Sequence, residues 1–81
     1  MHDTGYGPIS TQEVEQLIRT AFPTALIQVK DLRGGDHFGI EVISESFQGK
    51  SLIEQHQAVH AALRSEMDRR IHAVQIKTKV A

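Results

Sequence analysis

The stretch that decides the fold spans residues 37–63 and reads HFGIEVISESFQGKSLIEQHQAVHAAL. Its first part alternates: Phe38, Ile40 and Val42 share one side, and small or charged residues occupy the other. Alternation with a period of two residues is typical of a strand with one buried face. The stretch therefore predicts a strand whose apolar side faces the core.

A turn and a helix follow this strand. Residues 45–49 include a glycine, and we expect a turn there that brings Phe47 back toward the core. Ser51 and Glu54 have the spacing of a capping box, in which each side chain satisfies an unpaired backbone amide of the other, so a helix begins here. The apolar residues of its predicted stripe are Leu52, Val59, Leu63 and Met67.

The residues before this stretch predict a helix and a second strand. Ser10 and Glu13 form another capping box, and Pro23 ends the helix because a residue before proline is disfavoured in the helical region. Residues 25–31 alternate as a strand, and residues 33–36 contain two glycines and predict a hairpin connection. The apolar face of the helix comprises Val14, Leu17, Ile18, Ala21 and Phe22.

The last predicted element is a strand over residues 73–80, in which Val74, Ile76 and Val80 point one way. The element order is therefore α-β-β-α-β. A hairpin makes the first two strands antiparallel, and a helical crossover makes the third parallel to the second. We expect an α/β (α+β) domain with a three-stranded mixed sheet, both helices on one face and the other face open.

The composition restricts the functions open to the chain. Its 81 residues suffice for one domain with a small core, and they include five histidines but no cysteine. A disulfide framework, zinc-finger thiolates and a cysteine nucleophile are excluded. No phosphate-binding loop or serine-nucleophile motif is visible, so we expect no enzymatic activity. Lacking cysteine, a membrane-spanning apolar run and a signal-peptide pattern, the chain is expected to be cytoplasmic.

Several short motifs together resemble a known family. They are Ser44-x-x-Phe47-x-Gly49-x-Ser51, then His56, then Ile71-His72-Ala73, with His37-Phe38 opening the second predicted strand. In this order and spacing they resemble the BolA-like family over about residues 14–76. The resemblance implies a BolA-like domain over residues 10–81, related to type II KH folds. Residues 1–9 are expected to form a flexible N-terminal arm, because the glycines and the proline there disfavour regular structure.

The resemblance also implies a function centred on His72. BolA-like proteins are partners of monothiol glutaredoxins and share a [2Fe-2S] cluster with them, and His72 matches the family's C-terminal histidine ligand. Imidazole replaces thiolate on one iron of some [2Fe-2S] centres. The glutaredoxin and glutathione would supply the thiols that this chain lacks. The implied role is an adaptor in iron-sulfur cluster trafficking or in iron and redox regulation.

His37 follows the hairpin and matches a second histidine ligand that some family members place there. His37 is equally well a solvated hairpin histidine. From the residues alone, His72 is better explained as a half-buried strand-edge histidine bonded to a backbone carbonyl, and only the resemblance favours it as a ligand. Strict alternation places His37 opposite Phe38, whereas His72 shares its side with Val74. The two histidines would then point to different faces of the sheet.

His56 falls within the apolar stripe of the second helix. We expect it to be a structural core histidine held by a hydrogen bond, because buried polar groups need a partner. His56 and His60 also have the i, i+4 spacing of a helical metal pair, but no third ligand is evident.

Nucleic-acid binding, with a role in transcription, is the alternative function. Residues 64–81 carry five basic and two acidic side chains, in a chain with a net charge of −1. A basic segment on a KH-like fold could contact a phosphate backbone. Against this, the family's Arg-His-Arg is Gln55-His56-Gln57 here, and the Gly-x-x-Gly loop of RNA-binding KH domains is missing. DNA and a second copy of the chain are the alternative partners. The candidate nucleic-acid contacts are Arg64, Arg69, Arg70, Lys77 and Lys79.

Overall fold

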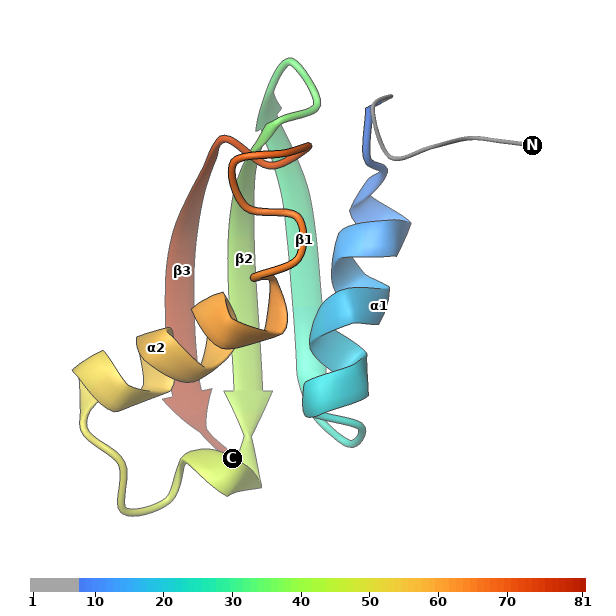
Figure 1. The fold of residues 1–81 in the computed structure, drawn as a ribbon. Helices are drawn as coiled ribbons and strands as arrows, with labels where there is room; N and C mark the ends of the chain where they lie inside the picture. The colour runs from blue at the N-terminus through green and yellow to red at the C-terminus, as the bar shows by residue number, and fades with distance from the viewer. Residues whose placement is uncertain (1–7) are drawn as a thin grey trace.

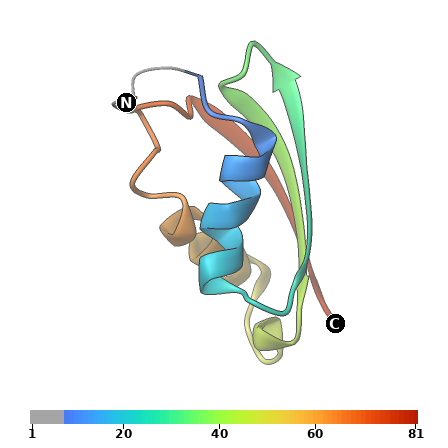
Figure 2. The ribbon, with the colours of Figure 1, turned by 90° about the vertical axis from the view of Figure 1, so that its right-hand side faces the viewer.

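The computed structural model describes residues 8–81 and has the predicted element order. Three strands form one sheet in the order β1-β2-β3, with β2 antiparallel to β1 and parallel to β3. Both helices cover the same face of this sheet and leave the other face open (Figures 1 and 2). The elements are α1 (Thr11–Ala21), β1 (Leu26–Arg33), β2 (His37–Ser44), η1 (Glu45–Phe47, a 3-10 turn), α2 (Leu52–Ala62) and β3 (Ala73–Val80).

The core lies between the central strand and the two helices. Along β2 every second residue is buried, and Phe38, Ile40 and Val42 face the helices as predicted. Ile9 is also buried, at 3% exposure, although the sequence placed it in the N-terminal arm. Residues 1–7 of that arm lie outside the described residues. Neither helix of residues 8–81 has the length and apolar character needed to cross a membrane.

The residues of the motif 44–51, between β2 and α2, stabilise the local structure. The Ser44 hydroxyl accepts a hydrogen bond from the Ser46 amide and caps η1. Phe47 is fully buried, and Gly49 adopts a φ of 79°, which costs glycine little. Ser51 then caps α2 through the predicted capping box with Glu54, and the equivalent box at the start of α1 is also present.

The predicted apolar stripe of α2 is wrong at its start, and the helix is shorter than predicted, although Val59 and Leu63 are fully buried and Met67 packs against the core. Leu52 is 60% exposed, whereas Gln55 and Val59 face the sheet. The helix ends at Ala62, and Leu63 is its C-cap. The chain therefore leaves the helix one turn earlier than the sequence pattern predicted.

The buried polar residue of α2 is Gln55, and not His56 as predicted. The Gln55 amide nitrogen donates to the Lys50 carbonyl at 3.0 Å, and its oxygen accepts from the Thr78 hydroxyl at 2.6 Å. His56 is only half-buried, and its ring forms no hydrogen bond among residues 8–81. Gln55 therefore makes the hydrogen bond that was expected of the neighbouring His56, and this bond joins α2 to β3.

Candidate metal centre

His37 and His72 lie side by side at one end of the sheet. His37 opens β2, and its Cα is in register with Ala73, the first residue of β3. The centroids of the two imidazole rings are 6.1 Å apart, and their planes are inclined by 32°. The structure therefore brings together the two histidines that the sequence placed on different faces.

His72 precedes β3, so strand alternation does not govern the direction of its side chain, and the expectation of different faces was wrong. The backbone amides of His72 and Ala73 both donate to the Asp36 carbonyl, at 2.8 and 3.2 Å. The hairpin thus fixes the backbone of His72 directly beside His37. The carboxylate of Asp36 also lies close to both rings.

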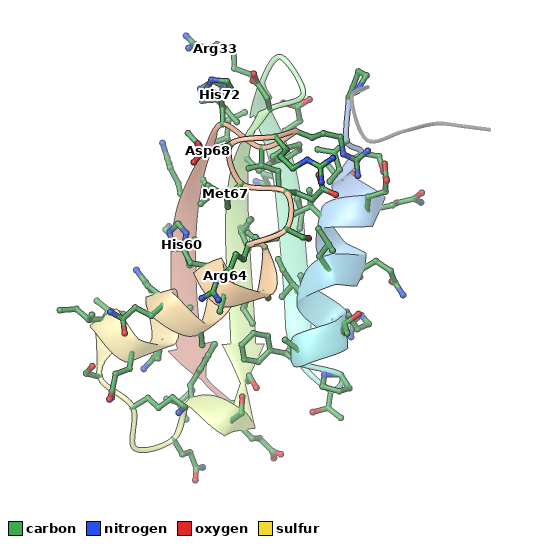
Figure 3. All side chains as sticks on the ribbon, viewed as in Figure 1. Arg33, His60, Arg64, Met67, Asp68 and His72 are labelled. Carbon is green, nitrogen blue, oxygen red and sulfur yellow. The ribbon has the colours of Figure 1, made fainter. Side chains whose placement is uncertain are left out.

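The two rings differ in exposure. The His72 side chain is 72% exposed and the His37 side chain 31% exposed. His72 projects from the end of the domain, near Arg33 and far from His60, which lies on α2 (Figure 3). A partner can therefore reach the His72 ring without any rearrangement of the core.

The loop that carries His72 is held to the helical layer by an ion-pair cluster. Arg70 donates through Nε and one terminal nitrogen to the two Glu66 carboxylate oxygens, at 3.0 and 3.1 Å, and contacts Glu13 of α1 at 3.3 Å. Its side chain is only 12% exposed. Hydrogen bonds from Arg70 lower the pKa of Glu66, and those bonds in turn raise the pKa of Arg70. Arg70 therefore anchors the loop two residues before the exposed histidine.

We expect Glu66→Gln to make stability less sensitive to acid. Because its pKa is lowered in the folded state, Glu66 stabilises the fold above its unfolded pKa near 4.5 and loses that contribution as the pH falls through the folded value. Near pH 7 the variant should lose about 1.5–3 kcal/mol, the usual range for a hydrogen bond to a charged group. Urea unfolding at pH 7 and below pH 4.5 measures the difference.

The difference in unfolding free energy between wild type and Glu66→Gln should shrink at the lower pH. The matched control is Glu45→Gln, which changes an exposed carboxylate in η1 and should leave the difference near zero at both pH values. A Glu66→Gln difference that stays constant with pH would contradict this role of the ion pair.

The five candidate nucleic-acid residues do not form one surface. Arg70 is engaged by two carboxylates, and Arg64 and Arg69 belong to the loop after α2. Lys77 and Lys79 lie on the open face of the sheet, and Lys77 is in register with Glu41 there. Arg69 and Arg70 both lie beyond the end of α2. Nucleic-acid binding stays a prediction, which fluorescence anisotropy with duplex DNA at low salt would test.

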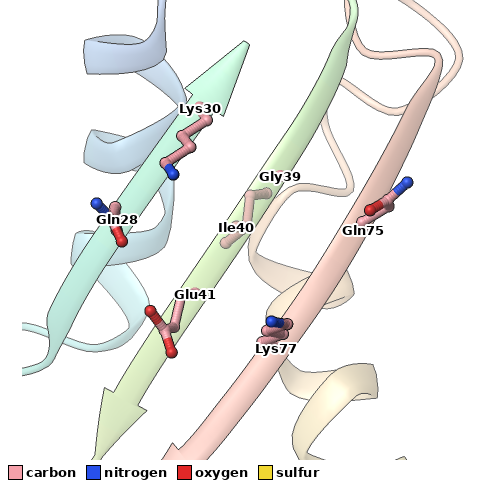
Figure 4. A pocket seen from close by; sticks show the side chains of 7 residues that line it. All are labelled: Gln28, Lys30, Gly39, Ile40, Glu41, Gln75 and Lys77. Carbon is pink, nitrogen blue, oxygen red and sulfur yellow. The ribbon is translucent and has the colours of Figure 1, made fainter. Parts of the chain in front are cut away.

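The open face also has a shallow depression of about 180 Å³ around Gly39 (Figure 4). Its rim is polar, with Lys30 on β1, Glu41 on β2 and Lys77 on β3. The volume is below that of ordinary small-molecule sites, which begin at about 300 Å³. The histidine pair, which brings two metal-ligand side chains together, is the stronger candidate site.

A small α-β-β-α-β domain with two neighbouring imidazoles at one end of its sheet defines a module that could donate nitrogen ligands to a metal. The sequence profile of the BolA-like protein family matches residues 18–81, and the chain belongs to this family.

Individual relatives agree with this assignment. The chain is 39% identical to Protein BOLA2 of Arabidopsis thaliana over 71 residues, which cover 85% of this chain and 75% of that protein. Among solved structures, a Bol-like protein from Babesia bovis superposes with a TM-score of 0.81 at 29% identity, covering 91% of this chain and 87% of that one. Yeast Fra2 gives a TM-score of 0.73 at 35% identity, covering 91% and 82%.

Proposed function

We propose that this chain is an adaptor that docks on a monothiol glutaredoxin and contributes His72, together with His37, to a [2Fe-2S] cluster bridging the two proteins. The observation that carries the proposal is the exposure of the His72 ring beside a second imidazole. Membership of the BolA-like family adds support, because the resemblance implied this partner.

The donor set fits such a shared cluster. Each iron of a [2Fe-2S] cluster takes two protein ligands besides the bridging sulfides, and imidazole is an accepted ligand at one of the irons. Among residues 8–81 no group of three or more histidine, aspartate and glutamate side chains is arranged to hold a metal ion. Two imidazoles leave the remaining cluster positions for the thiolates of glutaredoxin and glutathione. When bound, the cluster would supply one-electron redox chemistry or be passed on.

Adding the purified chain to a cluster-loaded monothiol glutaredoxin tests the proposal. Exchange of a thiolate for an imidazole changes the ligand field, so the visible absorption and circular dichroism should change and then saturate at a fixed ratio. Native mass spectrometry should show one complex containing both proteins and the cluster. Spectra that equal the sum of the separate components at every ratio would reject the proposal.

A further inference from the structure

Asp36 contacts both histidines of the candidate metal centre. Its Oδ1 lies 2.7 Å from Nδ1 of His37, which is a hydrogen bond. Its Oδ2 lies 3.8 Å from Nδ1 of His72, which is too long for a hydrogen bond. Both rings therefore turn the same nitrogen, Nδ1, toward one carboxylate.

The carboxylate is itself held in place. The Asp36 carbonyl accepts from the amides of His72 and Ala73, so the hairpin end cannot move away from the start of β3 without breaking two hydrogen bonds. The neighbouring Asp31 carboxylate accepts from the Gly35 amide at 3.1 Å and fixes the turn from the other side. Asp36 thus lies in a braced loop between two segments far apart in the sequence.

The carboxylate of Asp36 determines which ring nitrogen of His37 keeps a lone pair for a metal. An ionised carboxylate only accepts hydrogen bonds, so its 2.7 Å partner on neutral His37 must be Nδ1–H. A proton on Nδ1 leaves the lone pair on Nε2. A carboxylate behind a ligating imidazole also fixes the ring orientation and makes the imidazole a more basic ligand.

We infer that Asp36 is a positioning residue, which holds His37 in the Nδ1–H tautomer and leaves the Nε2 atom of His37 to bond iron beside His72. The inference rests on the proposed function for its metal and on the observed contacts for its geometry. Of the two roles open to His37, solvated hairpin histidine or second ligand, the inference assigns it the second. The glutaredoxin need not orient the His37 ring.

The tautomer is measurable in the chain without any metal. Long-range proton–nitrogen correlation NMR at about pH 8, where imidazoles are neutral, distinguishes a protonated Nδ1 from a protonated Nε2. Wild-type His37 should be the Nδ1–H tautomer, and Asp36→Ala should shift it toward Nε2–H. The matched control is Asp31→Ala, which removes the brace of the same turn but touches neither ring and should keep the Nδ1–H tautomer.

The same variants are then compared with cluster-loaded glutaredoxin. Loss of a group that orients a metal ligand typically weakens binding about 10–100-fold, so Asp36→Ala should weaken the complex by that factor and Asp31→Ala by less than about 3-fold. Backbone amide spectra of both variants check that the fold is retained.

The outcomes separate the two proposals. A wild-type His37 with Nε2–H, or a tautomer unchanged by Asp36→Ala, overturns the positioning role even if the cluster complex forms. An Asp36-dependent tautomer in a chain that forms no complex leaves the geometry standing and rejects the metal.

Discussion

Replacing His72 with alanine should abolish the spectral change that the wild-type chain produces on cluster-loaded glutaredoxin. His72 is the most exposed ring of the site, and a ligand that bonds iron directly has no substitute nearby except His37. Since loss of a group that only orients a metal ligand already costs about 10–100-fold, we expect removal of the ligand itself to cost at least about 100-fold in affinity for the cluster-loaded partner. Visible circular dichroism during titration measures the loss.

The matched control is His60→Ala, which removes an exposed histidine from α2, away from the site (Figure 3). Both substitutions are at the surface and should change the unfolding free energy by no more than about 0.5 kcal/mol. A His72→Ala chain that reproduces the wild-type titration would exclude this residue as a ligand. A loss shared equally by His60→Ala would point to α2 instead as the contact with the partner.

Local chemistry explains which parts of the fold the sequence predicts. Both capping boxes and the β2 alternation depend on residues within a few positions of one another, and all three are present in the structure. The paired glycines of the hairpin have φ of 68° and 76°, a conformation that only glycine adopts at little cost. Such signals do not require knowledge of the tertiary fold.

The end of α2 could not be predicted because its cause is not local. No proline or glycine stops the helix after Ala62. The chain instead turns so that Leu63 and Ile71 can both be fully buried, with Asp68 at a φ of 64° between them. Aspartate tolerates this left-handed conformation better than most residues. Aspartate is too common, however, for its presence alone to predict such a turn.

The sequence predicted which residues form the candidate site, but it did not predict how they are arranged. Family resemblance selected His72 and His37, while their 6.1 Å separation depends on hydrogen bonds from His72 and Ala73 to Asp36 across the fold. Asp36 itself was missed. The signal available was an acidic residue directly before His37, and a single such pair is frequent on protein surfaces.

The second large effect is expected from Phe47→Ala. Phe47 is fully buried, and its ring centroid lies 5.2 Å from that of Phe22 at the end of α1, so it joins the turn before α2 to the first helix. Truncating a buried phenylalanine costs about 3–5 kcal/mol through lost burial and the cavity left behind. A small domain has about 5–15 kcal/mol in total, so the variant should be close to unfolding at room temperature. Urea unfolding followed by far-ultraviolet circular dichroism measures the loss.

Phe47→Leu is the milder substitution to compare with Phe47→Ala. It keeps most of the buried volume, so it should lower the unfolding free energy by less than about half as much as the alanine variant. It also keeps the test informative if the alanine variant does not fold. Because the capping box of α2 does not involve the Phe47 ring, the leucine variant should retain the helical signal and unfold in one transition at lower urea. If alanine cost no more than leucine, the ring would not be a core anchor, and the motif 44–51 would act through its caps and its glycine alone.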